Sequence, residues 1–126
     1  MEISKVGILG SGNVGQALAM GFLKHGYKVM LGTRNPDKMK EWVEQTKGKV
    51  AVGGFKETAQ FGDIIVLAVK GAAAQGALTS AGVGNFENKI VIDTTNPISD
   101  DSPVNGVLRF FTSLDESLME KLQASF

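Results

Sequence analysis

Three glycines close to the N-terminus constrain the fold of this chain more than any other feature. Gly10, Gly12 and Gly15 stand at the spacing G-x-G-x-x-G, directly after an apolar run that ends at Leu9. From Asn13 the apolar residues follow a helical period, so the glycines lie in a turn between a strand and a helix. Such a turn presents backbone N–H groups at the start of a helix, where a phosphate group binds readily.

Each glycine of this turn has its own expected role. Gly10 makes the tight turn, Gly12 lets a pyrophosphate approach the main chain, and Gly15 lets the helix pack close to the strand. Ser11 and Asn13 add side chains that can donate hydrogen bonds. The alternative is that the glycines only shape the turn, but the strand before them and the helix after them favour dinucleotide binding.

The rest of the chain continues to alternate strands with helices. Strands are expected at residues 3–9, 29–31, 50–52, 64–69 and 90–92, and helices are expected to begin near residues 13, 36, 57, 72 and 114. The strands are continuous in their apolar character, as in a parallel sheet that is covered on both faces. The pattern predicts an α/β fold over residues 1–126: a single doubly wound parallel sheet of the Rossmann type.

Local signals predict where individual helices begin and end. Gly26 ends the first helix, and Asn35 caps the second with Pro36 at its first position. Ser113 and Glu116 have the spacing of a capping box, which opens the last helix. The first helix is expected to turn one apolar face to the sheet, made of Val14, Ala17, Leu18, Gly21 and Phe22.

Composition and charge exclude several classes of function. The chain has 13 basic and 13 acidic residues, so no net positive field attracts nucleic acid or an anionic membrane. It has no cysteine, which excludes disulfides and thiolate metal sites. No apolar run is long enough to cross a membrane, and the N-terminus does not read as a signal peptide. We expect a cytoplasmic protein with no nucleic-acid or membrane partner and no metal.

The end of the second strand indicates which dinucleotide is bound. An NAD site carries an acidic residue there, which bonds to the adenine ribose, but this chain has Thr33 and Arg34 instead. Asp37 follows Pro36 and is explained by a favourable charge at the start of a helix. Arg34 offers a planar fork for a phosphate, and Lys38 adds a second cation. These residues favour NADP, with the alternative that Arg34 is only a solvated side chain.

Four motifs together resemble a known family. "GILGSGNVGQALA", "LGTRNPDK", "DIIVLAVK" and "VIDTTNP" are similar to the N-terminal domain of NADPH-dependent F-420 reductases, which move hydride between NADP and the deazaflavin coenzyme F-420. The same motifs resemble the oxidoreductase domain of the STEAP metalloreductases and, more loosely, the pyrroline-5-carboxylate reductases. "GTRNP" is more specific than the glycine loop.

The resemblance implies a set of residues that bind the cofactor. At the glycine loop they are Ser11, Asn13 and Val14; at the 2′-phosphate, Thr33, Arg34 and Lys38; beside the nicotinamide, Ala68, Val69, Thr95, Asn96 and Pro97. Lys70 completes the set, because it follows a strand at the edge where ligands bind in such sheets. No catalytic residue is expected, since hydride transfer between two bound molecules needs positioning more than a protein acid or base.

Two departures from the family leave the acceptor open. Lys70 stands where F-420 reductases often have an apolar residue or proline. The chain also ends at Phe126, where family members continue into a strand that helps to complete the acceptor pocket, so it resembles their cofactor domain. The acceptor is expected to be F-420 or a flavin-like molecule, with an imine or a ferric chelate as alternatives. A non-catalytic module that binds or senses NADP is a third possibility, and a homodimer is a further expectation.

Overall fold

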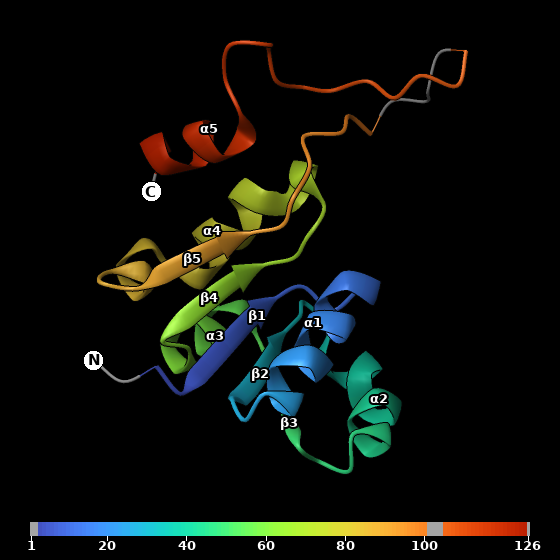
Figure 1. Ribbon diagram of the computed structural model, residues 1–126, viewed down its shortest axis with the longest axis vertical. Coiled ribbons are helices and arrows are strands. Elements are labelled where there is room, and N and C mark those ends of the chain that lie inside the picture. Colours follow the sequence, from blue (N-terminus) through green and yellow to red (C-terminus); the bar gives the residue numbers. More distant parts are fainter. Residues whose placement is uncertain (1–2, 101–104, 126) are drawn as a thin grey trace.

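The computed structural model describes residues 3–100 and 105–125, in which five strands form one parallel sheet (Figure 1). The strands are β1 (Lys5–Leu9), β2 (Lys28–Gly32), β3 (Val50–Gly53), β4 (Ile64–Leu67) and β5 (Ile90–Asp93). Their order in the sheet is β3-β2-β1-β4-β5, and every neighbouring pair is parallel. The chain therefore has the predicted doubly wound α/β fold, and the direction of winding reverses between β1 and β4. At such a point the carboxyl ends of the strands open a crevice for ligands.

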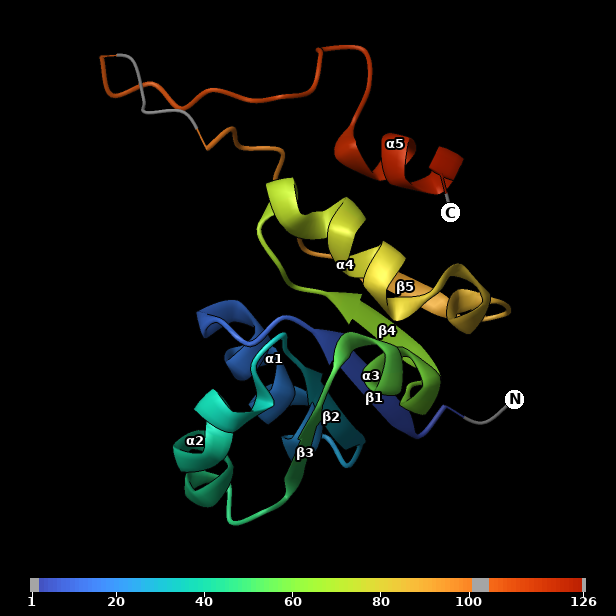
Figure 2. The ribbon, with the colours of Figure 1, turned by 180° about the vertical axis from the view of Figure 1, so that it is seen from behind.

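Helices lie on both sides of this sheet (Figures 1 and 2). They are α1 (Asn13–Lys24), α2 (Lys40–Gln45), α3 (Phe55–Phe61), α4 (Ala74–Ala81) and α5 (Leu118–Ser125). Helices α1 and α2 lie on one side, and α3 and α4 on the other. Helix α5 joins the α4 side, where Leu118 and Leu122 are part of the same core cluster as Leu78. No helix in the described ranges is long and apolar enough to cross a membrane.

Strand β1 shows why the strands are apolar without alternation. Its Val6 and Ile8 belong to the core beneath α1, whereas Leu9 belongs to the core beneath α3 and α4. All three side chains are fully buried. A strand in the middle of a parallel sheet is buried on both faces, so each of its positions favours an apolar residue.

The start of β1 is tied to the turn before β4. The carboxylate of Asp63 accepts hydrogen bonds from the backbone N–H groups of Ser4 and Lys5, both at 3.1 Å. These two bonds stabilise the charged form and lower the pKa of Asp63 below its usual value of 3.8. The Asp63 N–H also donates to the Lys5 carbonyl at 2.8 Å. Asp63 thus aligns the first and fourth strands.

The buried face of α1 differs from the prediction. Gly15 and Ala19 are buried and Leu18 and Phe22 are half-buried, whereas Val14 is 55% exposed. The predicted Ala17 and Gly21 are also exposed, so the face is displaced around the helix by part of a turn. The displacement follows from the close approach of Gly15 to the turn before the helix, because only a residue without a side chain fits there.

The predicted helix ends are confirmed in part. Gly26 has a φ of +90° after α1, and the Tyr27 N–H donates to the Phe22 carbonyl, as in a Schellman motif. Pro36 opens a 3-10 turn (Pro36–Met39), but the Asn35 side chain makes no capping hydrogen bond. Four other boundaries move by two residues: β1 begins at Lys5, α3 at Phe55 and α4 at Ala74, and β4 ends at Leu67. A second 3-10 turn (Gly71–Ala73) precedes α4 and a third (Val83–Phe86) follows it.

The capping box predicted at Ser113 and Glu116 is wrong by one helical turn. The Glu120 N–H donates to the Ser117 hydroxyl and the Ser117 N–H donates to the Glu120 carboxylate, both at 3.1 Å. Both pairs have the same S-x-x-E spacing. Leu114, which follows the first serine, is fully exposed, so a helix that began there would bury no leucine at its start. The start at Leu118 buries leucines of successive turns against α4.

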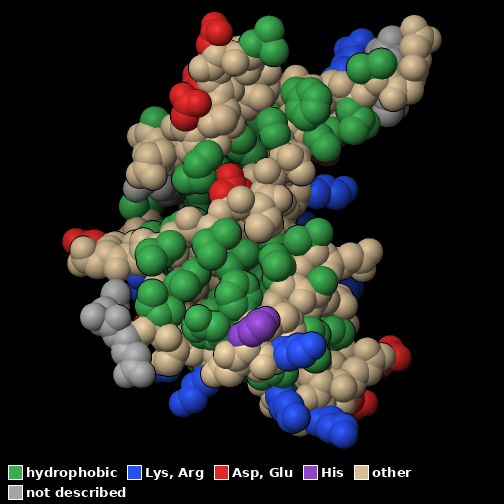
Figure 3. Space-filling view, viewed as in Figure 1, with side chains coloured by type: hydrophobic (Ala, Val, Ile, Leu, Met, Phe, Trp, Pro, Cys, Tyr) green, Lys and Arg blue, Asp and Glu red, His purple; other side chains and the backbone are tan. Residues whose placement is uncertain are grey.

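The expectation that β5 is buried on both faces is also wrong. Ile90 is 55% and Ile92 40% exposed, on a strand at the edge of the sheet. Among the described helices, those on the α1 side cover β1, β2 and β3 but leave this part of the sheet open. Figure 3 shows the apolar side chains gathered there.

Candidate functional site

The glycine turn packs against the end of β2 and the residues that follow β4. Gly10 has a φ of +131°, and its N–H donates to the carbonyl of Gly32 at the end of β2 at 2.9 Å. A Cβ at Gly10 would overlap the carbonyl of Ala68, and a Cβ at Gly15 would overlap the carbonyl of Gly10. At Gly12, by contrast, no atom lies within 4 Å of a Cβ position. The turn is therefore crowded at two glycines and open at the third.

A hydrogen-bonded bridge joins the glycine turn to the end of β2. The Ser11 hydroxyl donates to the Thr33 hydroxyl oxygen at 3.0 Å, and the Asn35 N–H donates to the same oxygen at 3.2 Å. Thr33 is 7% exposed, so its position is well fixed. The Gln16 amide also holds the turn, by donating to the Ser11 carbonyl at 2.9 Å.

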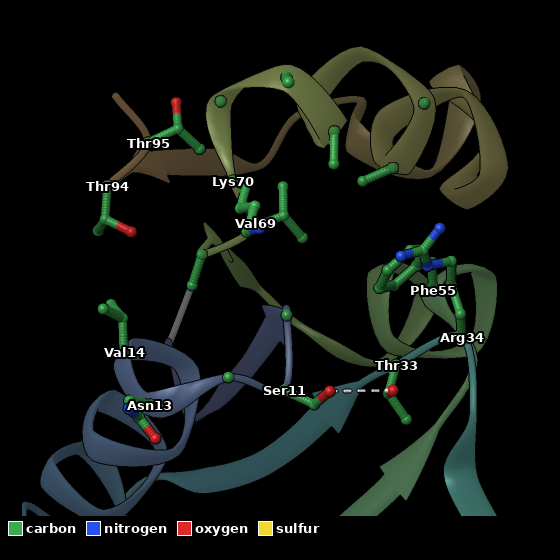
Figure 4. Close-up of a pocket in the computed structure, with 18 of the residues that line it drawn as sticks. Ser11, Asn13, Val14, Thr33, Arg34, Phe55, Val69, Lys70, Thr94 and Thr95 are labelled. Atoms are coloured by element: carbon green, nitrogen blue, oxygen red, sulfur yellow. Dashed lines mark hydrogen bonds between the residues drawn. The ribbon is translucent and has the colours of Figure 1, made fainter. Parts of the chain in front are cut away.

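A cavity of about 890 Å³ runs along the carboxyl ends of the strands, above this turn (Figure 4). One end lies beside β2 and contains Thr33, Arg34 and Phe55; the other lies beyond β4 and β5 and contains Val69 and Thr95. The open glycine, Gly12, lies on its floor. The volume is within the range of cofactor sites, and the place is the one where ligands bind in sheets of this topology.

The β2 end of the cavity is cationic. Arg34 and Lys38 are both exposed and both line it, on either side of the start of the 3-10 turn. Among the described residues, no aspartate or glutamate lines any part of the cavity. Asp37, the nearest acidic residue in the sequence, lies in the first turn of the 3-10 helix and is not part of the lining. This end is suited to a phosphate group rather than to a pair of ribose hydroxyls.

The far end of the cavity is formed by two loops that pack tightly together. A Cβ at Gly71 would overlap the backbone carbonyl of Asn96, so the segments after β4 and β5 touch there. The Thr94 hydroxyl donates to the Leu67 carbonyl at 2.8 Å. Asp93 accepts hydrogen bonds from the Thr95 N–H at 2.8 Å and from its hydroxyl at 2.6 Å, so Asp93 stabilises the turn after β5.

The cavity brings together thirteen of the fifteen residues predicted to bind the cofactor. They are Gly10, Ser11, Gly12, Asn13, Val14, Thr33, Arg34, Lys38, Ala68, Val69, Lys70, Thr95 and Asn96. Gly15 lies beneath the turn, where it acts through packing. Pro97 is not part of the lining, and its carbonyl accepts a hydrogen bond from the Phe111 N–H. Ala68 and Val69 follow β4 rather than ending it.

Several lining residues were not predicted. Phe55 comes from the start of α3, and Figure 4 shows it beside Arg34. One wall of the cavity is a row of small residues before and along α4: Ala72, Ala73, Gly76, Ala77 and Ser80. The sequence signal for this wall is "GAAAQGA", whose composition is biased toward small residues. Phe55 follows the carboxyl end of β3, which is the signal that could have found it.

Comparison with known proteins agrees with the fold. Residues 5–97 match the model of the family described as NADP oxidoreductase, coenzyme F420-dependent. A crystal structure of a candidate F420-dependent NADP-reductase from Arthrobacter sp. FB24 is similar over 99% of this chain, with 28% identity and a TM-score of 0.86. A pyrroline carboxylate reductase from Plasmodium falciparum with NADP bound, at 21% identity, covers 78% of this chain and shares the fold with a TM-score of 0.58.

This chain is shorter than the proteins it matches. It spans 58% of the Arthrobacter chain and 35% of the Plasmodium chain. A glycerol-3-phosphate dehydrogenase [NAD(P)+] from Neisseria meningitidis is 39% identical over 51 residues, which are 40% of this chain and 16% of that enzyme.

The family match covers most of the chain. It covers all five strands and extends from β1 to the loop after β5 that closes the cavity. The cofactor expected from the sequence, NADP, is the one that the family description names. The chain belongs to the family of coenzyme F420-dependent NADP oxidoreductases.

Proposed function

We propose that this chain binds NADP(H) in the cavity and positions it for hydride transfer to or from a redox acceptor, F-420 or a flavin-like molecule. The observation that carries the proposal is the charge pattern of the cavity: Arg34 and Lys38 at the β2 end and no carboxylate among the described lining residues. This pattern fits a 2′-phosphate and would repel no part of NADP. NADP supplies the hydride chemistry when it is bound.

The residues of the cavity fit the other parts of NADP as well. The pyrophosphate fits above Gly12, where the backbone is open and α1 begins. The N–H groups in the first turn of α1 have no partner within the helix and can donate to it. Thr33 and Ser11 fix the distance between this anion site and the 2′-phosphate site. At the far end, Val14 and Val69 offer apolar surface to a planar ring.

These residues act by positioning. The predicted site contains no histidine and no carboxylate, and hydride transfer between stacked rings requires alignment rather than protein acid–base groups. Two other functions stay open. One is a reductase of imines or ferric chelates that uses the same cofactor, and the other is a module that binds NADP without catalysis.

One titration series separates these functions. NADPH is titrated into the protein, and NADPH absorbance is then followed with F-420, flavins, an imine and a ferric chelate. Tight binding and oxidation with F-420 or a flavin support the proposal. Oxidation only with the imine or the chelate supports the second function, and tight binding without oxidation by any acceptor supports the third. A protein that does not bind NADPH would show that the proposal is wrong.

A further inference from the structure

The cavity has three cations at two separate places. Arg34 and Lys38 belong to the β2 end, and Lys70 lies after β4, beside Val69 (Figure 4). No acidic side chain among the described lining residues stands between them. Lys70 is therefore a cationic group separate from Arg34 and Lys38, the pair that fits the 2′-phosphate.

The backbone packing fixes the place of Lys70 in the cavity. Lys70 immediately precedes Gly71, whose close contact with the Asn96 carbonyl joins the loops after β4 and β5. Lys70 is therefore held beside the loop that carries Thr95 and Asn96. Its side chain is exposed, and its ammonium group forms no hydrogen bond or ion pair within residues 3–100 and 105–125.

The anionic groups of NADP have other partners in this cavity. The 2′-phosphate fits Arg34 and Lys38, and the pyrophosphate fits the N–H groups at the start of α1. Lys70 is left without an anion, although it lines the end at which the nicotinamide meets the acceptor. A lysine has a long, flexible stem and can bind a carboxylate or a phosphate as a point charge.

We propose that Lys70 binds an anionic group of the acceptor, so that this site selects acceptors that carry a carboxylate or a phosphate. The inference rests on the proposed function, because it takes NADP to occupy the rest of the cavity. Val14, which is 55% exposed, and Val69 line the same end and fit the nicotinamide ring, on which the acceptor's ring stacks. Lys70 therefore determines specificity for the acceptor and acts on neither the hydride nor a proton.

Matched pairs of acceptors test this inference. FMN and riboflavin differ by one phosphate group, and F-420 differs from its deazaflavin chromophore by an anionic side chain. With saturating NADPH, kcat/KM is measured for both members of each pair. Binding of both flavins to the protein loaded with NADP⁺ is measured in parallel by flavin fluorescence, so that the test does not depend on turnover. We expect the wild-type protein to prefer the anionic member by about fivefold to thirtyfold.

Variants of Lys70 assign the preference to its charge. Lys70→Met should remove the preference and Lys70→Arg should keep it. The sequence groups Lys70 with the cofactor-binding residues, so the Kd for NADPH is measured for both variants: an unchanged Kd assigns Lys70 to the acceptor instead. The control is Lys56→Met, at an exposed lysine of α3 outside the cavity, which should behave as the wild type.

The outcomes separate failure of this inference from failure of the proposed function. Equal binding and equal kcat/KM for both members of each pair, in a protein that binds NADPH, would overturn the inference alone. So would a Lys70→Met variant that binds NADPH as poorly as it binds FMN, because Lys70 would then belong to the NADP site. A wild-type protein that does not bind NADPH would instead contradict the proposed function.

Discussion

The Ser11 hydroxyl donates a hydrogen bond to the Thr33 hydroxyl oxygen at 3.0 Å, across 22 residues of sequence. This bond joins the glycine turn to the end of β2, and so connects the two places in the cavity that fit phosphate groups. The Asn35 N–H donates to the same oxygen, which makes Thr33 the common partner of both loops. The spacing of the two anion sites thus depends on one buried side chain.

Substitution of Thr33 should loosen this connection in the protein without cofactor. Thr33→Val keeps the shape of the side chain but leaves the Ser11 hydroxyl and the Asn35 N–H without their acceptor, at a cost of about 1 kcal/mol in the free energy of unfolding. Ser11→Ala should cost less, and the double variant should cost about 0.5–1 kcal/mol less than the sum of the two. Urea unfolding measures all three, and additive effects would show that the bond contributes nothing. Thr79→Val, at an exposed helical threonine, is the control.

Arg34 should determine the preference for NADPH over NADH. Arg34→Ala removes a charged hydrogen-bond donor from the 2′-phosphate site, which corresponds to a loss of about tenfold to a hundredfold in affinity for NADPH. Affinity for NADH should not change, because NADH lacks that phosphate. Fluorescence titration of both cofactors measures the effect, with Lys24→Ala at the far end of α1 as the control. Equal affinities of the wild-type protein for NADPH and NADH would contradict the assignment.

Alanine at two glycines of the turn should separate binding from stability. Gly12→Ala places a methyl group in open space, so the free energy of unfolding should change by less than about 0.5 kcal/mol while NADPH binding falls sharply. Gly15→Ala drives a methyl group into the Gly10 carbonyl and should destabilise the fold by about 1–3 kcal/mol. Thermal unfolding and NADPH titration of both variants distinguish the two roles. A Gly12→Ala protein that binds NADPH normally would place the pyrophosphate elsewhere.

Asp63 should make stability depend on pH in the acid range. Its pKa is lowered in the folded protein by the N–H groups of Ser4 and Lys5, so the folded state binds its proton less readily than the unfolded chain does. Its stabilising effect is therefore complete above the ordinary pKa of 3.8 and is lost as the pH falls through the lowered value. The Tm of Asp63→Asn should lie below that of the wild type near neutral pH, and the difference should shrink as the pH falls below 3.8. A difference that does not vary with pH would exclude this role.

The start of α5 gives a prediction with an internal control. Ser117→Ala removes the acceptor of the Glu120 N–H and should cost about 0.5–2 kcal/mol in the free energy of unfolding of this helix. Ser113→Ala, at the other S-x-x-E pair, should have no effect. Amide hydrogen exchange within residues 118–125 measures the opening of the helix directly. An equal effect of both substitutions would mean that the helix begins earlier than Leu118.

The sequence by itself determined the order of strands and helices and most of the predicted residues that line the cavity. These depend on local patterns: the apolar runs of β1 and β4, the glycine spacing, and Arg34 in the place of an acidic residue. A period of 3.6 or an unbroken apolar run is visible in a short window, because it follows from the geometry of a single element. Parallel strands also bring their carboxyl ends to one edge of the sheet. Thirteen of the fifteen predicted site residues therefore line one cavity.

The tertiary structure alone decided which positions face the core and which residues complete the cavity. The period of α1 was visible in the sequence, but its rotation toward the sheet was set by the contact of Gly15 with the Gly10 carbonyl. Two S-x-x-E pairs were equivalent as sequence, and burial of Leu118 against the α4 side selected the second. The position of Phe55 after β3 is a local signal, but Phe55 reaches the β2 end of the cavity because it packs against Gly32, which is a relation between elements. Contacts of this kind depend on the docking of whole elements, which local patterns do not determine.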